Sequence, residues 1–176
     1  IPNEFTRLIE GMGGTGLNAG TSYDFVYYFN SLPSTQVEKW IDLYSHRFSE
    51  PVFRLFQSEL ETVYEEKNRA MDNPFRVFNE TSRKYFFKNH PYGQQTILGS
   101  VDHLKTPSLS KMKQFYDKYY VPNNMSLILA GDFDKRSVKK MIKDKFGRLK
   151  RGNSIEKINV QEDDCNGREV VDLSIT

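Results

Sequence analysis

The sequence predicts an α+β domain in which several helices pack on one side of a mostly antiparallel sheet. Three patterns lead to this fold class: apolar residues recur at helical spacing in several segments, aromatic residues alternate over 23–29, and a short apolar run fills 125–130. With 176 residues, the chain is long enough to bury the core of one domain.

The first third of the chain predicts a helix, a strand and a second helix. Asn3 is a candidate N-cap, and the helix after it ends at the glycine run 11–16. The aromatic residues of 23–29 alternate onto one face, as in a β-strand. Pro33 and Ser34 open a second helix with the apolar stripe Val37, Trp40, Ile41, Tyr44 and Phe48.

The middle of the chain predicts two helices separated by a break. A helix is expected over about 53–71, Asn73-Pro74 interrupts it, and the aromatic-rich segment to Phe87 is helical again. The chain from Asn89 to Pro107 reads as a turn and an ordered loop.

The last third predicts two more helices and two strands. Ser108 caps a helix that turns Met112, Phe115, Tyr116 and Tyr119 inward, and 125–130 is a short strand buried on both faces. A helix with the stripe Val138, Met141, Ile142 and Phe146 ends at Gly147, and 170–176 reads as a strand without a closing turn.

Composition argues against several partners. The chain has 25 basic and 23 acidic residues, a balance that does not favour nucleic acid as the main partner. No apolar run approaches the roughly 20 residues that span a membrane. The single cysteine, Cys165, excludes an internal disulfide framework and a cysteine-based zinc site, and its acidic neighbours oppose thiolate formation.

Two motifs carry no chemistry. Gly11, Gly13 and Gly16 satisfy G-x-G-x-x-G, but a helix precedes the glycines and a strand follows them, the reverse of a dinucleotide site. We therefore expect the glycines to allow a tight turn or a close backbone approach. The histidines, at 46, 90 and 103, lack the i, i+4 spacing of a helical metal site, so we expect structural or exposed roles.

The helix over 53–71 carries four glutamates on two different faces. At about 100° per residue from Phe56, a stripe within about 60° is buried, formed by Leu60, Val63, Lys67, Ala70 and Met71. Glu61 and Glu65 fall on the opposite, solvated face. Glu59 and Glu66 stack two turns apart at the edge of the stripe, where a half-buried carboxylate needs a cation, a hydrogen-bond donor or a metal.

Four stretches in order resemble the pitrilysin/insulinase-type zinc metallopeptidases, which include the mitochondrial processing peptidases. They are GGTGLNAGTSYDFVYYF, ELETVYEEKNRAMDNP, HPYGQQTILGSVDHL and FYDKYYVPNNMSLILAGDFD, and together they cover nearly the whole chain. The resemblance implies the α+β fold of a processing-peptidase half-domain.

The resemblance also implies a site. In this family, zinc is held by the two histidines of an H-x-x-E-H helix and by a distant glutamate, with the motif's own glutamate as general base. The match places the distant zinc ligand at Glu66 and a supporting carboxylate of the catalytic apparatus at Glu59. It makes Asn18 and Ala19 substrate contacts on an edge strand that pairs with extended peptide; equally, Asn18 only supports the turn.

The sequence departs from the family in one respect, since no H-x-x-E-H occurs in it. We expect that helix upstream of Ile1, and we interpret residues 1–176 as one partial domain of N-terminal catalytic type, truncated at both ends. The chain alone is then not expected to hydrolyse peptides or bind Zn²⁺ tightly. Its partners would be the upstream helix, a homologous second half or subunit, and a peptide substrate.

Two other functions stay open. A non-catalytic homologue would serve as a structural or peptide-presenting subunit. An unrelated α+β binding domain would carry the same pair of glutamates at a helix edge without a metal.

Overall fold

The computed structural model describes residues 3–164 and 166–174. The chain forms two compact units, described separately below. The first takes in the chain up to Phe53 together with Ser110–Ile155, and the second takes in Arg54–Leu109 together with the segment from Glu156 onward. No described helix is both long and apolar enough to cross a membrane.

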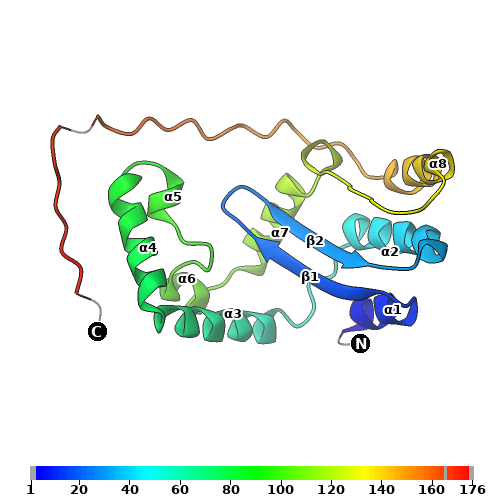
Figure 1. Cartoon of the computed structure of the whole chain (residues 1–176), viewed down its shortest axis with the longest axis horizontal. Helices are drawn as coiled ribbons and strands as arrows, with labels where there is room; N and C mark the ends of the chain where they lie inside the picture. Colours follow the sequence, from blue (N-terminus) through cyan, green and yellow to red (C-terminus); the bar gives the residue numbers. More distant parts are fainter. Residues whose placement is uncertain (1–2, 165, 175–176) are drawn as a thin grey trace. The chain divides into compact units, whose positions relative to one another are not determined.

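The first unit combines a two-stranded antiparallel hairpin with helices (Figure 1). Its elements are α1 (Glu4–Gly11), β1 (Thr15–Thr21), β2 (Val26–Ser31), η1 (Ser34–Gln36), α2 (Val37–Ser49), α7 (Leu109–Tyr119, from Ser110 on), η2 (Pro122–Asn124) and α8 (Lys135–Phe146).

The core of this unit lies among the hairpin, α1, α2 and α8. Ile9 and Ile41 are fully buried, and the residues Val37, Trp40, Tyr44 and Val138 complete the cluster. The stripe expected on the second helix is therefore the buried face of α2. The stripe of α8, apart from buried Val138, packs against the same cluster.

One side chain joins the hairpin to α2. Asn30 of β2 points inward, and its Oδ1 accepts hydrogen bonds of 2.9 Å from Trp40 Nε1 and from the Tyr44 hydroxyl. Both donors are buried, so each would cost free energy without an acceptor. The pair of hydrogen bonds fixes which face of the hairpin turns toward the helix.

Arg47 of α2 lies among aromatic rings. Its guanidinium carbon is 4.2 Å from the ring centre of Phe5 and 4.6 Å from that of Tyr28, which is within the range of a cation–π interaction. The Tyr28 and Tyr120 hydroxyls share a hydrogen bond of 3.0 Å, and Tyr116 donates to the Phe48 carbonyl. Burial raises the pKa of Tyr116 to about 12, so this hydroxyl stays a donor at neutral pH.

The glycine run ends α1, as expected. Gly13 has φ +76°, a left-handed conformation that favours glycine, and its N–H donates to the Glu10 carbonyl. The helix-before, strand-after order excludes the dinucleotide reading in the structure as it did in the sequence.

The second unit is helical. It contains α3 (Phe56–Met71), α4 (Pro74–Phe86), α5 (Pro91–Gln94) and α6 (Val101–Lys105). Asn73 caps α4 by accepting from the amides of Phe75 and Arg76, with Pro74 at the first helical position. The break at Asn73-Pro74 was predicted, whereas the short helices α5 and α6 lie in a stretch expected to be a turn and a loop.

The C-terminal segment is held to this unit by two carboxylates. Glu162 accepts from the amides of Asn89 and His90, and Glu169 pairs with Lys88 at 2.8 Å. Desolvation raises the pKa of Glu162, but the surrounding backbone donors outweigh it, so this pKa lies below its ordinary value of 4.5.

The α+β class is confirmed, with a sheet smaller than expected. Within the described residues the sheet has two strands, and neither 125–130 nor 170–174 forms one. An apolar run becomes a buried strand only beside a pairing neighbour. No described strand pairs with 125–130, and Ile128 is 85% exposed.

The inward face predicted for α7 was partly wrong. Tyr116 and Tyr119 are partly buried, but Met112 and Phe115 are exposed. The stacked rings of Tyr116 and Tyr120, 4.5 Å apart, form the contact with the rest of this unit instead.

We expect Asn30→Leu to lower the free energy of unfolding by about 1–3 kcal/mol, because it leaves the Trp40 and Tyr44 donors without their acceptor. Tyr44→Phe removes one hydroxyl and leaves no unsatisfied donor, so it should cost about 0.5–1.5 kcal/mol. Urea denaturation followed by circular dichroism measures both. A smaller loss for Asn30→Leu than for Tyr44→Phe would contradict the role of Asn30.

A second prediction concerns Lys67 of α3, which is buried and pairs with Glu80 of α4 at 3.1 Å. Glu80→Gln should lower the free energy of unfolding by about 1–3 kcal/mol, because a buried ammonium loses its charged partner. Glu61→Gln, at an exposed position of the same helix, should stay within about 0.5 kcal/mol of the parent. Similar losses in both variants would show that the pair does not hold α3 to α4.

Candidate functional site

Helix α3 carries the glutamates, and its packing decides where each one points. Its inward stripe is the predicted one: Leu60 and Val63 are half-buried, and Lys67 and Ala70 are buried. Only Met71, at the end of the helix, departs from the prediction, since it is 46% exposed. The ion pair of Lys67 with Glu80 therefore fixes the rotation of α3 about its axis.

Glu59 and Glu66 lie on one side of α3, seven residues apart, so about 10 Å separates them along the axis. Both are exposed, which corrects the expectation that they are half-buried. The reason is that no described element covers the edge of the stripe on which they lie. Among the described residues, neither carboxylate has a hydrogen-bond or ion-pair partner, so both oxygens of each remain available to a ligand.

The surroundings of Glu66 are basic. It lines a hollow of about 450 Å³ together with Arg69, Ala70, Asn73 and Arg76. Arg76 Nε also lies 3.8 Å from Glu80, at the margin of an ion pair. Positive charge beside a carboxylate favours its ionised form, which is the form that a metal binds.

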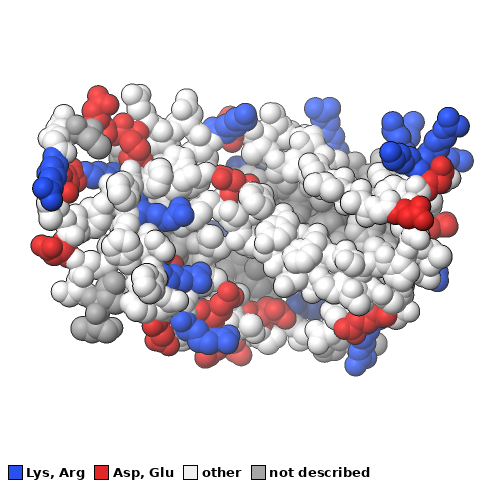
Figure 2. Space-filling model, viewed as in Figure 1, with Lys and Arg blue, Asp and Glu red and all other residues white. Residues whose placement is uncertain are grey.

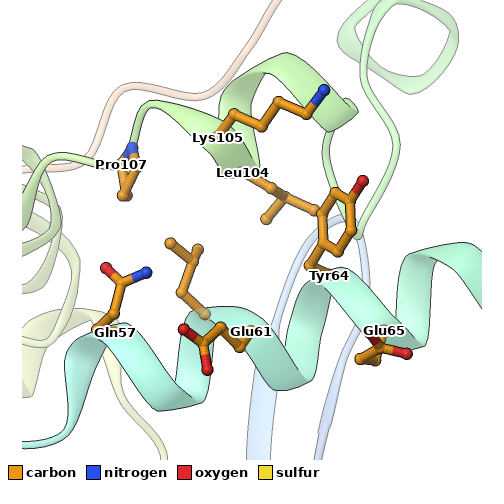
Figure 3. A pocket seen from close by; sticks show the side chains of 8 residues that line it. Gln57, Glu61, Tyr64, Glu65, Leu104, Lys105 and Pro107 are labelled. Carbon is orange, nitrogen blue, oxygen red and sulfur yellow. The ribbon is translucent and has the colours of Figure 1, made fainter.

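Glu61 and Glu65 are exposed, as predicted, yet their face of α3 is not uniformly solvated. They line a second hollow, of about 290 Å³, with Gln57, Leu60, Tyr64, Leu104, Lys105 and Pro107. Figure 3 shows Tyr64 of α3 and Leu104 of α6 directed toward each other across it. The sequence missed this hollow because α6 was expected to be loop.

Strand β1 carries Asn18 and Ala19, and both are exposed. Asn18 lies opposite Phe29 and Ala19 opposite Tyr28, and Asn18 Oδ1 accepts from the Ala19 amide at 2.8 Å. Among the described residues β1 pairs with β2 alone, so its other edge has no strand beside it. That edge offers unpaired backbone groups, the requirement for adding an extended peptide.

The outer face of the hairpin is aromatic. The alternation over 23–29 places Phe25, Tyr27 and Phe29 side by side, with ring centres 5.8 Å apart at each step, and each ring is about half exposed. An ideal Cβ on Gly20 would lie 2.4 Å from the Tyr27 ring, so this ring requires glycine opposite it. The sequence correctly put these aromatics on one face, but gave no sign that this face is exposed.

The two glutamates belong to the second unit and the strand to the first. Among the described residues no three His, Cys, Asp or Glu side chains are placed to hold a metal together. Glu66 fits a zinc site as one ligand, being an accessible carboxylate on a regular helix.

The histidines have the roles expected of them. His46 and His103 are exposed, and His90 accepts from the Tyr92 amide through Nδ1 and contacts the Tyr92 ring. Cys165 lies outside the described residues.

Comparison with known families matches most of the chain. Residues 2–99 match the model of insulinase (peptidase family M16), and residues 108–173 match the model of the peptidase M16 inactive domain.

Curated relatives point the same way. The chain is 28% identical over 162 residues to the probable zinc protease PqqL of Escherichia coli and 30% identical over 155 residues to the zinc protease PqqE of Helicobacter pylori. These alignments cover 88% and 84% of the chain, but 17% and 33% of the relatives.

Among solved structures, the periplasmic protease PqqL from Escherichia coli superposes with a TM-score of 0.74 at 25% identity, over 90% of this chain and 18% of that one. The chain thus spans about a third or less of these relatives. The resemblance of its glycine turn, glutamate helix and later segments is confirmed, and the chain belongs to the insulinase-type peptidase family M16.

Proposed function

We propose that this chain is part of a zinc-dependent endopeptidase of extended peptides, in which Glu66 is one of the zinc ligands. The observation that carries the proposal is the exposed, unpartnered carboxylate of Glu66 on a helix whose rotation is fixed by buried Lys67. Its relatives are named zinc proteases, which supports zinc as the cofactor. Bound zinc supplies a Lewis acid that polarises a carbonyl and activates water.

Glu59 acts as a supporting carboxylate. It lies two turns before Glu66 on the same side of α3 and is likewise exposed without a described partner. A carboxylate there can accept a hydrogen bond from a metal-ligating side chain and fix its orientation. It is a positioning residue in this proposal.

The edge of β1 takes the peptide. Backbone hydrogen bonding to an unpaired strand edge recognises extended chains without strong sequence selection. Asn18 and Ala19 are exposed on this strand, and the turn formed by the glycine run leads directly into it. The intact site also requires an H-x-x-E-H helix, and a homologous second half would close around the peptide.

For the protein carrying the H-x-x-E-H helix, we expect Glu66→Gln to lower zinc content and peptidase activity together, because an amide is a much weaker zinc ligand than a carboxylate. Metal analysis of the purified variant and a fluorogenic peptide assay measure both.

Glu65→Gln is the matched control, since Glu65 is also exposed but lies on another face of α3. It should leave zinc content and activity nearly unchanged. Equal losses from the two variants would refute the assignment of faces.

A further prediction separates the two roles of Asn18. As a substrate contact, Asn18→Ala should raise KM by about tenfold while the melting temperature stays the same. If Asn18 only holds the Ala19 amide and supports the strand, the melting temperature falls and KM is unchanged. Peptidase kinetics and a thermal melt of the same variant distinguish these outcomes.

A non-catalytic homologous subunit is the second candidate, because the chain contains no H-x-x-E-H. Such a subunit would bind extended peptide along β1 without zinc. Peptide binding by a zinc-free full-length protein, with no turnover after zinc is added, would favour it.

A further inference from the structure

A strongly basic segment follows the candidate strand region in the first unit. Residues 135–151 include nine Lys or Arg and one acidic residue, a net charge of +8. The whole chain carries +2, which leaves −6 for the remainder. The charge is therefore concentrated in about a tenth of the sequence.

Helix α8 arranges this charge in a row. The basic row, as we call it, consists of Arg136, Lys139, Lys140 and Lys143, at the i, i+3, i+4 and i+7 positions of one helix face. All four are exposed. Figure 2 shows Lys and Arg side chains gathered where Figure 1 draws α8.

The opposite face of α8 keeps the row in place. Val138 is 5% exposed, and Met141, Ile142 and Phe146 pack against the core of this unit. Lys145, on the inner side, pairs with Asp42 of α2. The row is thus presented by a helix that cannot rotate without breaking core contacts.

Folding does not explain the row. Within the described residues none of its four side chains has an ion-pair partner, in contrast to Lys145. Like charges spaced three or four apart on a helix destabilise it slightly. A row of this kind is a charged surface whose complement lies outside the unit.

The chemistry of the row selects the partner. It has no aromatic side chain on which a nucleobase could stack, and no large apolar side chain of the kind that anchors a protein interface. Three of its four members are lysines, which act as point charges and do not fork onto single phosphates as arginine does. A flat array of negative charge matches a straight row of point charges.

We propose that the basic row of α8 docks the protein on an anionic phospholipid surface. The exposed basic residues that follow the helix, Arg148, Lys150 and Arg151, lengthen the charged segment. Attraction of this type adds up over each Lys or Arg near the surface and is screened by salt. The acidic remainder of the chain would orient the molecule with α8 toward the lipid.

The test is co-sedimentation of the protein with vesicles of phosphatidylglycerol in phosphatidylcholine. We expect binding at about 0.1 M salt, loss of binding near 1 M salt, and no binding to pure phosphatidylcholine. The variant Arg136→Gln/Lys139→Gln/Lys140→Gln/Lys143→Gln should bind at least about tenfold more weakly.

The control variant is Arg7→Gln/Lys39→Gln/Lys113→Gln/Lys157→Gln, which removes one exposed arginine and three exposed lysines elsewhere. It should bind within about twofold of the parent. An equal loss in the control would show that net charge, and not the row, is responsible, and would overturn the proposal. Tighter binding to duplex DNA or to polyglutamate than to the vesicles would overturn it as well, in favour of a nucleic acid or an acidic protein.

Circular dichroism of both variants checks that they are folded. The row is remote in sequence from Glu66 and needs no metal, so vesicle binding is independent of the proposed peptidase activity. Failure to bind any anionic vesicle at low salt would refute the proposal and leave the zinc-ligand assignment untouched.

Discussion

The first unit depends on one acceptor, the side-chain oxygen of Asn30. By accepting from both Trp40 and Tyr44, it fixes the inner face of β2 against α2 and places Tyr28 beside Arg47. Because alternate residues of a strand face opposite ways, the same choice turns Phe25, Tyr27 and Phe29 outward. The position of β1, and with it the proposed peptide edge, follows from its pairing with β2.

A buried lysine has the corresponding role in the second unit. Lys67 lies in the apolar stripe of α3 and reaches Glu80 of α4, so the helix has one stable rotation. Glu66, the next residue, is then turned about 100° away and into the open. A metal ligand must be accessible yet held on a rigid support, and this pairing of buried cation and exposed anion satisfies both requirements.

The chain uses charge in two different ways. Lys67, Lys145 and Lys88 are each paired with a carboxylate, and the pairs join elements of a unit or tie the C-terminal segment to it. The basic row of α8 has no such partner among the described residues. Charges of the first kind specify the fold, whereas the second kind adds nothing to it and is available for a partner.

The sequence by itself determined the helical stripes of α2, α3 and α8, the break at Asn73-Pro74 and the separation of Glu59 and Glu66 from Glu61 and Glu65, because these follow from the period of the helix and the geometry of proline. It also carried the family, through four motifs in order. Only the tertiary structure decided which faces are covered: Glu59, Glu66 and Met112 proved exposed, 125–130 formed no strand, and α6 formed a hollow with α3. Periodicity states which residues share a face, but burial depends on whether another part of the chain packs against that face, and local sequence does not encode that neighbour.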